Sequence, residues 1–405
     1  MNLQGEGPGT GAMLRHVDND PRRWVMLAVI SLAMLLSLTS WMTATAIGPE
    51  LQLRWSLSSS QLGWLTTIVQ LGFVAGTALG AILNLADILP SRGYFALSAL
   101  LAAASNALLL STDDFLEALP ARFFTGFFLA GVYPPGMKMV STWFQSARGL
   151  AIGTVVGALT VGKATPYLLK AAGGTDTAIV IIGGSTAGLL ASILVASAYR
   201  DGPYPFPSRP FEWSRVGKLL GHRKTMLATG GYLGHMWELY AMWTWISAFL
   251  FAAAAGVVSD TVIDLVVFGT IGAGALGCVW GGAAADRIGR HRVVNLAMAI
   301  SGGCCLMAGM VFQAPFSFLV ILTWIWGFFV VADSAQFSAL VTEVAPQDSV
   351  GTALMLQTSL GFLLTMVTIQ AVPAVVSVLG WQWAFAFLAL GPACGICSVL
   401  FLERS

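Results

Sequence analysis

The sequence predicts an all-α membrane protein made of two six-helix bundles related by a pseudo-two-fold axis. Of its 405 residues, 57% are hydrophobic and only 10% are charged, which is too few charged residues to solvate a globule of this size. Twelve apolar runs of about 18 to 25 residues follow one another, the length that crosses a hydrocarbon core of roughly 30 Å as a helix. The first six runs recur in the second six at a fixed spacing.

Two charged turns reveal this repeat. Asp87 lies in a turn that ends at Arg92, and Asp286 lies in a turn rich in arginine, 199 positions later. The same offset carries Trp24, where the first apolar run begins, to Arg223, just where the seventh begins. Because one offset aligns both landmarks, we interpret the chain as an internal duplication.

The predicted elements follow in chain order. Residues 1–23 form a polar tail that we expect to be disordered, 24–200 the first bundle, 201–224 a linker rich in proline and basic residues, and 225–402 the second bundle. A cleaved signal peptide is the competing interpretation of the first run, although that run exceeds the usual signal core of about 7 to 15 residues. The helices are expected near 24–46, 61–83, 93–110, 118–141, 149–172, 177–199, 225–252, 260–283, 293–312, 316–341, 350–378 and 382–402.

The basic residues predict the orientation. Fifteen of the 20 Lys and Arg lie in the N-terminal segment, at the C-terminus and in alternate loops. Cytoplasmic loops of multi-pass proteins carry such an excess. We therefore expect a cell inner (plasma) membrane protein with both termini cytoplasmic. The five cysteines lie in apolar runs and predict no disulfide framework.

The turn after the eighth run carries the most specific motif. It reads Gly282-Ala-Ala-Ala-Asp286-Arg287-Ile-Gly289-Arg290-His-Arg292. This pattern resembles the signature loop of the major facilitator superfamily, and the turn from Leu83 to Arg92 resembles a degenerate copy that lacks both glycines. Arg122, followed four residues later by Gly126, resembles the superfamily's motif in the fourth helix. The resemblance covers residues 24–402.

The resemblance implies a secondary active transporter that moves a small solute by alternating access, without enzymatic activity or cofactor. It also implies a cytoplasmic gate in which the signature aspartate meets the N-terminus of a helix from the opposite half, where the helix dipole favours an anion. The expected receivers are the helices that begin after Ala147 and after Ser349. The expected gate residues are Asp87, Arg92, Arg148, Asp286, Arg287 and Arg290. We expect a monomer whose partners are the solute, protons and the lipid bilayer, with no nucleic acid.

Ionisable side chains inside the predicted helices are the candidates for transport chemistry. A charge at the centre of a membrane helix costs on the order of 2.5 to 3.5 kcal/mol and needs a partner or a wet cavity. Arg122 and Lys163 lie on antiparallel helices at similar expected depth, where they can bracket an anion. With Lys138, these cations outnumber the embedded anions of the first bundle, which favours a small anionic or carboxylate-bearing solute. The alternatives are a snorkelling Arg122 and an ion pair of Lys163 with Glu238.

A second candidate group lies on the seventh helix. His235 and Glu238 are three residues apart, so they share a helix face. Burial favours the uncharged form of both side chains, so they can exchange protons near neutral pH, and Asp333 in the tenth helix is the third candidate. The expected proton-coupling residues are therefore Glu238, His235 and Asp333. The expected substrate-binding residues are Arg122, Lys163, His235, Trp237 and Tyr240. A purely structural pair and interfacial aromatic anchors remain the alternatives.

Two other functions stay open. The Cys394-Gly-Ile-Cys397 spacing and methionines near His235 suit a copper-like metal-ion transporter, although packing explains small residues at this spacing and no metal site is predicted. A non-transporting membrane sensor or assembly factor of the same fold is the second alternative. The sequence contains no Walker loop and no Ser-His-Asp order, so ATP-driven transport and enzymatic turnover are unsupported.

Glycines at four-residue steps predict close helix packing. The superfamily pairs its second helix with the eleventh and its fifth with the eighth. We therefore expect the ridges to form the seam between the halves. The ridges are Gly72, Gly76 and Gly80, then Gly149, Gly153 and Gly157, then Gly269, Ala273, Gly277 and Gly281.

Overall fold

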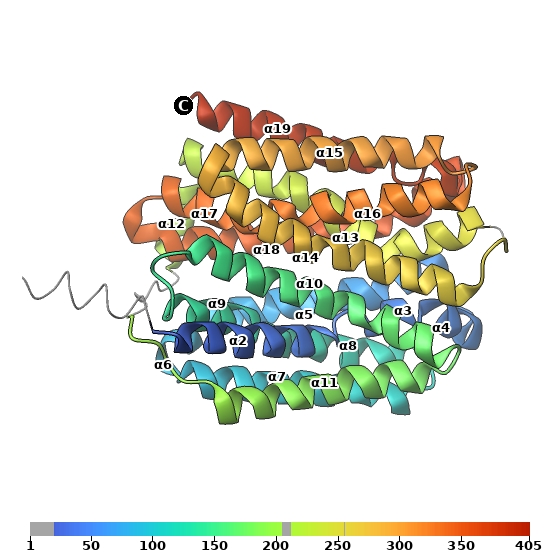
Figure 1. Ribbon diagram of the computed structural model, residues 1–405, viewed down its shortest axis with the longest axis horizontal. Coiled ribbons are helices and arrows are strands. Elements are labelled where there is room, and N and C mark those ends of the chain that lie inside the picture. Colours follow the sequence, from blue (N-terminus) through green and yellow to red (C-terminus); the bar gives the residue numbers. More distant parts are fainter. Residues whose placement is uncertain (1–19, 205–211, 255) are drawn as a thin grey trace, which may run out of the picture.

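The computed structural model describes residues 20–204, 212–254 and 256–405, and the side chain of Asp87 lies outside this description. Most of the predicted tail and residues 205–211 of the predicted linker therefore lie outside the described part. Each of the twelve predicted segments is helical, and the long helices lie side by side along the longest axis of the molecule (Figure 1). The first described helix begins at the end where the chain finishes, which we call the terminal end, and α4 lies at the opposite end.

The first half is built mainly from six helical segments, two of which are broken. Its elements are α2 (Arg22–Leu38), α3 (Thr43–Ala46), α4 (Gly48–Trp55), α5 (Ser59–Ile82), α6 (Leu85–Ile88), α7 (Ser91–Ala107), η1 (Leu108–Ser111), α8 (Phe115–Leu129), α9 (Tyr133–Ser141), α10 (Arg148–Gly173) and α11 (Thr177–Ala198). The short helix α12 (Trp213–Leu220) follows in the predicted linker and packs on α18.

The second half repeats this order with different interruptions. Its elements are α13 (Arg223–Ala254), α14 (Asp260–Ile288), α15 (Arg290–Met310), α16 (Phe316–Ala332), α17 (Ser334–Val344), η2 (Gln347–Ser349), α18 (Val350–Leu379), η3 (Trp381–Trp383), η4 (Ala386–Ala389) and α19 (Leu390–Glu403).

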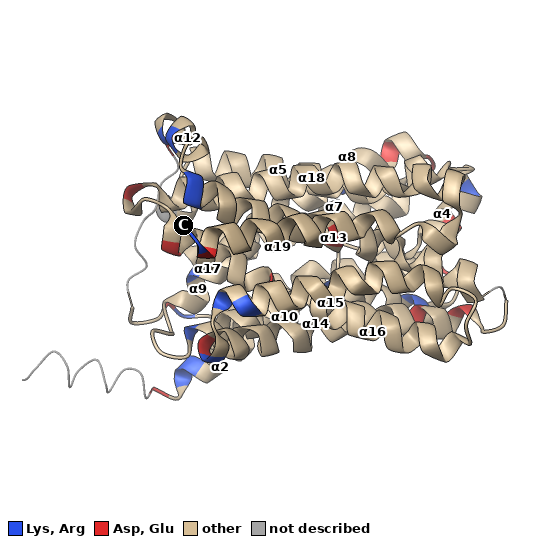
Figure 2. Ribbon diagram, turned by 90° about the horizontal axis from the view of Figure 1, so that it is seen from above, with Lys and Arg blue, Asp and Glu red and all other residues tan. Residues whose placement is uncertain are grey.

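Ten helices among the described residues are long and apolar enough to cross a membrane. The two predicted segments outside that set are α2, which has 17 residues, and α13, whose 32 residues include His235 and Glu238. Lys, Arg, Asp and Glu residues gather at the two ends of the molecule and are sparse between them (Figure 2). This distribution matches an apolar slab that covers the middle of the bundle.

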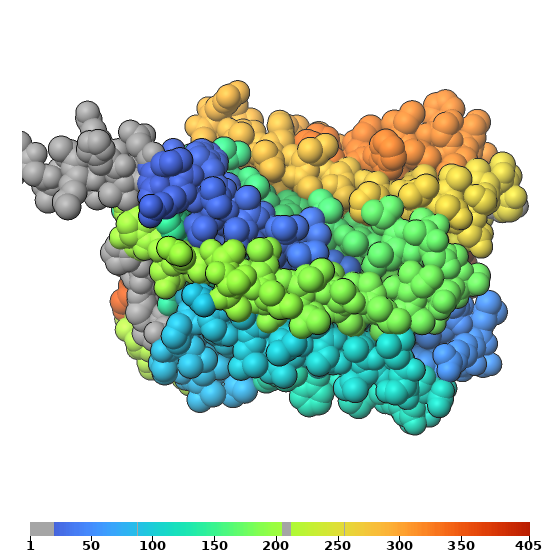
Figure 3. Space-filling model, turned by 60° about the horizontal axis from the view of Figure 1, so that its bottom comes forward, coloured from blue at the N-terminus to red at the C-terminus, as the bar shows by residue number. Residues whose placement is uncertain are grey.

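Two helix pairs join the halves. Helix α10 packs along α14, and α5 packs along α18, as the resemblance predicted. Figure 3 shows a face on which first-half helices, blue to green, meet the yellow and orange helices of the second half.

The glycine ridges only partly form this seam. A methyl group placed on Gly153 would lie 2.9 Å from the carbonyl oxygen of Cys278, and one on Gly157 would lie 3.0 Å from that of Ala275, so this α10 ridge does face α14. The other two ridges were assigned wrongly, because Gly72 faces α8 and Gly277 faces α16 inside their own halves. Glycine spacing predicts close approach but does not identify the neighbour.

Four predicted helices are broken, and in the twelfth the break lies between Trp383 and Ala386. The first stops at Leu38 before α3, the fourth is interrupted between Leu129 and Tyr133, and the tenth is interrupted at Asp333. In the fourth, Pro134 and Pro135 follow the break and lack the backbone N–H that would continue the ladder. The breaks leave backbone carbonyls that need other partners.

The signature turn is shorter than predicted. Helix α14 runs to Ile288 and α15 begins at Arg290, so Gly289 alone connects them. Its φ of 91° is favoured by glycine, which confirms the expected tight reversal. Asp286 therefore sits on the last turn of a helix and not in a loop.

Candidate functional site

Lys163 lies at the interface between the halves. Its side chain extends from α10, is 5% exposed, and its Nζ donates a hydrogen bond to Tyr240 Oη at 2.5 Å. The same Nζ lies 4.4 Å from the ring centroid of Trp41, 4.8 Å from that of Tyr240 and 5.2 Å from that of Trp243. Trp41 belongs to the first half, whereas Tyr240 and Trp243 lie on α13. We call these four residues the lysine cage.

The lysine cage holds a cation without an anion. No Asp or Glu oxygen among the described residues lies within 4.0 Å of the Lys163 ammonium group. Each aromatic face offsets part of its desolvation, by about 0.5 to 2 kcal/mol. Phe362 completes the packing, with its centroid 5.3 Å from Tyr240 and 5.9 Å from Trp41. Aromatic rings thus pack closely around the ammonium group.

Arg122 is fully buried, but it does not face Lys163. Its Nη1 donates to Ser40 O at 3.0 Å and to Asn106 Oδ1 at 3.2 Å, its Nε lies 3.5 Å from Leu65 O, and its Nη2 donates to Trp41 O. Two of these acceptors are carbonyls freed by the end of α2. The snorkelling alternative is wrong, and the expected bracket of Arg122 and Lys163 around an anion does not form. Arg122 instead fixes the backbone of the residue that covers Lys163.

Glu238 is buried inside the second half. Its carboxylate accepts hydrogen bonds from Trp326 Nε1 at 2.5 Å, Ser301 Oγ at 2.9 Å and Cys305 Sγ at 3.2 Å. No basic nitrogen of the described residues lies within 4.0 Å, so the alternative ion pair with Lys163 is absent. All three donors are neutral, which allows this carboxyl group to change its charge without breaking an ion pair.

His235 pairs with Asp333 and not with Glu238. Its Nδ1 lies 2.9 Å from Asp333 Oδ1, and its Nε2 lies 2.9 Å from Ser334 Oγ. Both side chains are buried, and Asp333 marks the break between α16 and α17. The shared helix face was a correct inference, but His235 and Glu238 use different partners on it.

Trp237 lies apart from the lysine cage. It is half-buried, its Nε1 lies 3.4 Å from Phe387 O, and its ring packs on Phe387 with centroids 6.1 Å apart. Of the five residues predicted to bind substrate, the structure therefore brings together only Lys163 and Tyr240. Sequence reasoning missed Trp41, because nothing in the chain indicates that the end of α2 meets α10 and α13.

A buried ion cluster joins the halves at the opposite end, and sequence reasoning missed it as well. Lys170 Nζ lies 3.1 Å from Glu50 Oε1 and 3.8 Å from Asp264 Oδ1. Glu50 is on α4 of the first half and Asp264 is on α14 of the second. We call these three residues the opposite-end triad. Lys170 lies near the expected end of its helix at residue 172, and nothing in the sequence indicates that Glu50 and Asp264 approach it.

At the terminal end, Asp286 meets the start of α10. A methyl group placed on Gly149 would lie 3.3 Å from Asp286 Oδ2, so the carboxylate contacts the first turn of that helix, one of the two expected receivers. The N-terminus of a helix carries a partial positive charge that favours an anion.

The other predicted gate residues lie on neighbouring elements. Arg290 donates to Glu343 Oε1 at 2.7 Å, Arg148 donates to Ser141 Oγ at 3.2 Å, and Lys138 donates to Ala86 O at 2.5 Å. Arg92 and Arg287 are exposed, and Asp87 is on α6 with its side chain outside the described part.

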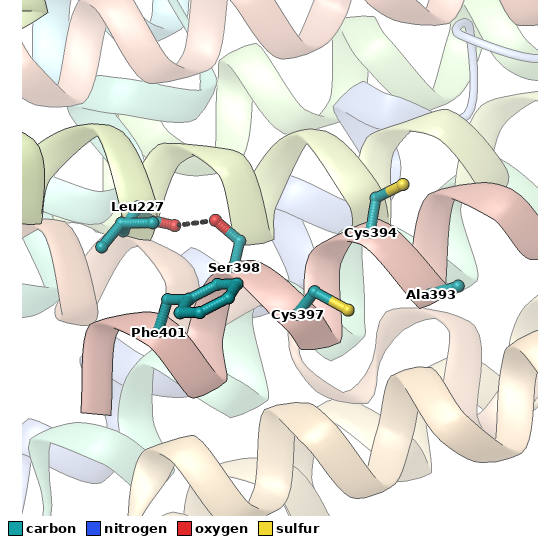
Figure 4. Close-up of a pocket in the computed structure, with 6 residues that line it drawn as sticks. All are labelled: Leu227, Ala393, Cys394, Cys397, Ser398 and Phe401. Atoms are coloured by element: carbon teal, nitrogen blue, oxygen red, sulfur yellow. Dashed lines mark hydrogen bonds between the residues drawn. The ribbon is translucent and has the colours of Figure 1, made fainter. Parts of the chain in front are cut away.

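A groove of about 420 Å³ lies on the outer surface between α13 and α19 (Figure 4). Cys394 and Cys397 are exposed along it, and Ser398 Oγ donates to Leu227 O at 2.8 Å. Within the described ranges, no group of three or more His, Cys, Asp or Glu residues could hold a metal ion. The copper-like alternative therefore gains no clustered ligand set here.

Comparisons with known proteins agree with this architecture. The model of the family described as Major Facilitator Superfamily matches residues 29–261 and 258–405. The crystal structure of the nucleoside transporter NupG aligns with a TM-score of 0.70 at 12% identity, over 93% of this chain and 99% of that one. The puromycin resistance protein pur8 of Streptomyces alboniger is 32% identical over 160 residues, 39% of this chain and 31% of that protein, so the match spans under a third of that relative. The chain therefore belongs to the Major Facilitator Superfamily, and its long apolar helices are those of a multi-pass membrane protein.

Proposed function

We propose that this protein is a proton-coupled secondary transporter of a small anionic solute that binds at Lys163 between the two halves. The proposal rests on the Lys163 ammonium group of the lysine cage, which has a hydrogen bond and aromatic neighbours but no counter-ion among the described residues. A buried cation without a counter-ion is costly, so an anionic ligand is the group that would best offset its desolvation. Solutes of transporters with two repeats bind at the interface of the repeats, which is where this cation lies.

The proton is carried, in this proposal, by Glu238, with the His235–Asp333 pair as a second site. Glu238 and Tyr240 are two residues apart on α13, about 200° around the helix. Glu238 therefore faces its own half while Tyr240 faces Lys163. A rotation or shift of α13 couples the two environments, because one rigid helix carries both groups.

Alternating access then requires two gates that open in turn. Asp286 and the start of α10 form the gate at the terminal end, together with Arg148 and Arg290, and the opposite-end triad forms the other. We assign the terminal end to the cytoplasm of a bacterial-type inner membrane because it carries the arginine-rich turns. A reporter that is active only in the cytoplasm is expected to be active when fused after Ser405, and an inactive but intact fusion would reverse the assignment.

Uptake into proteoliposomes with an imposed pH gradient tests the proposal. We expect labelled organic anions to accumulate in response to the gradient in the wild type and not in Lys163→Gln. Glu238→Gln is expected to lose the stimulation by the gradient while it still exchanges solute across the membrane. The matched control is Lys218→Gln, which removes an exposed charge on α12. Anion uptake that is equally fast in Lys163→Gln, or insensitive to pH in the wild type, would contradict the proposal.

A nucleoside is the second candidate solute. The aromatic walls of Trp41, Tyr240 and Trp243 suit a flat base, and the fold resembles that of a protein named as a nucleoside transporter. Such a neutral solute does not need the ammonium group. Nucleoside uptake that persists in Lys163→Gln would favour this candidate. Saturable binding without flux for every solute would favour the sensor alternative.

A further inference from the structure

We propose that the solute is a monocarboxylate with an apolar, flat body and no amino group. This inference rests on the proposed function, since it takes an anion at Lys163 as given. It adds the chemical class of that anion. The class follows from three properties of the lysine cage and its neighbours: free hydrogen-bond donors, no carboxylate that could pair with a ligand cation, and aromatic rings that form the walls.

The surroundings of Lys163 are rich in unused donors. Trp41 Nε1, Trp243 Nε1 and Tyr167 Oη are all buried, and none of them has a hydrogen-bond partner in the described part of the chain. Tyr167 follows Lys163 by one turn of α10 and so shares its face. Tyr240 Oη accepts the Lys163 bond, which leaves its own hydrogen to donate. An unpaired buried donor is unfavourable, so a ligand with several acceptor lone pairs in one place, such as a carboxylate, suits this group.

The cage also lacks an anion for a ligand cation. The buried carboxylates of the described residues are committed elsewhere: Glu238 to Trp326, Asp333 to His235 and Asp264 to Lys170. An ammonium group on the ligand would enter without a counter-ion, which disfavours zwitterions and amines. One lysine balances one negative charge, so a second carboxylate would remain unpaired. Arg122, which could bind a planar oxyanion through two N–H groups, is already bound to backbone carbonyls.

The walls favour an apolar body. Phe73 lies 5.2 Å from the Trp41 centroid and 4.8 Å from that of Phe362, and Phe362 lies 5.3 Å from Tyr240. These rings come from both halves, so they separate when the halves open and can close on a flat ligand. Stacking on such rings adds to affinity beyond the buried area. A carboxylate as small as acetate would leave these ring faces uncovered.

Matched pairs of ligands test the inference on the purified full-length protein. Thermal stabilisation and inhibition of uptake are measured for benzoate against benzyl alcohol, phenylpyruvate against phenylalanine, benzoate against phthalate, and benzoate against acetate. We expect the first member of each pair to bind at least tenfold more tightly than the second. Lys163→Met should abolish the binding of benzoate, and Lys218→Met should leave it unchanged.

A milder variant covers the case in which Lys163→Met does not fold. Tyr167→Phe removes one hydroxyl group and is expected to weaken benzoate binding several-fold without lowering the melting temperature of the ligand-free protein. Equal binding of acetate, phthalate or phenylalanine that still depends on Lys163 would overturn this inference and leave the proposed function intact. Anion binding that no Lys163 or Tyr167 variant alters would overturn both.

Discussion

Arg122 and Lys163 are both buried cations of the first half, yet their surroundings assign them different tasks. The Arg122 guanidinium uses its fork of donors on Ser40, Trp41, Leu65 and Asn106. Among the described residues, Lys163 hydrogen-bonds only to the hydroxyl group of Tyr240, and aromatic faces surround the rest of its ammonium group. The difference follows from geometry, since a guanidinium can bind several carbonyls at once and an ammonium is a compact charge that an anion can approach.

Arg122 is therefore a positioning residue that acts through Trp41. Arg122→Lys keeps the charge but cannot reach all the carbonyls, so we expect it to lower the free energy of unfolding by on the order of 2 to 3 kcal/mol. We also expect a several-fold loss of anion affinity, because the Trp41 ring is no longer held over Lys163. Melting temperature and anion binding are measured together, with Trp41→Phe as the comparison. An Arg122→Lys protein with wild-type stability and affinity would show that the charge alone matters.

Along α10, successive stretches of one helix face perform different mechanical tasks. Gly149, Gly153 and Gly157 lie against α14 near the terminal end, Lys163 occupies the centre, and Lys170 reaches Asp264 at the opposite end. Contact near the terminal end depends on the absence of side chains, because carbonyl oxygens of α14 approach the glycines closely. Contact at the opposite end depends on charge.

Gly153→Ala tests the first of these contacts. The added methyl group would lie 2.9 Å from Cys278 O, so we expect α10 and α14 to separate near the terminal end and uptake to fall several-fold. Gly272→Ala on α14 is the matched control, since a methyl group there meets nothing within 4 Å. Reactivity of a cysteine introduced at Ser146 reports the opening. Equal uptake and equal cysteine reactivity in both variants would show that close contact between α10 and α14 is not required for transport.

In the whole molecule, the halves are joined at both ends in this structure. The opposite-end triad and the Ser60–Gln370 hydrogen bond of 2.9 Å connect them at one end, and Asp286 on α10 connects them at the other. Transport through the centre requires these connections to break one at a time. The relative stability of the two connections therefore sets which side of the membrane the site faces at rest.

Removing the Lys170 charge is expected to shift this balance. Lys170→Met leaves Glu50 and Asp264 as unpaired carboxylates, so the opposite end should open and the protein should lose stability. Adding Glu50→Gln and Asp264→Asn removes that repulsion, and we expect stability to return while the opposite end stays open. Labelling of a cysteine at Thr67, which is buried and accepts a hydrogen bond from Gln370 of the other half, measures opening, and thermal unfolding measures stability. Unchanged labelling in both proteins would show that the triad is not a gate.

Much of the fold was readable from the sequence because the bilayer imposes segment length and because one offset aligns Asp87 with Asp286. The turn at Gly289 and the contact of Asp286 with α10 were also predicted. The lysine cage and the opposite-end triad were not. Lys163 and Tyr240 lie on different helices, and Trp41 lies in the break between α2 and α3. Which residues meet there depends on helix rotation and on the break after Leu38, neither of which apolar periodicity encodes.

The composition of the α10 seam also has an evolutionary consequence. The two helices can approach this closely only when residues 149, 153 and 157 are small. Each of these positions should therefore keep a small residue in related sequences, independently of the other two. An ion cluster can keep its attraction after substitution if the charges of its members change together. We therefore expect positions 50, 170 and 264 to covary. Related sequences in which acidic and basic residues are exchanged among these positions would retain the same gate with the charges reversed.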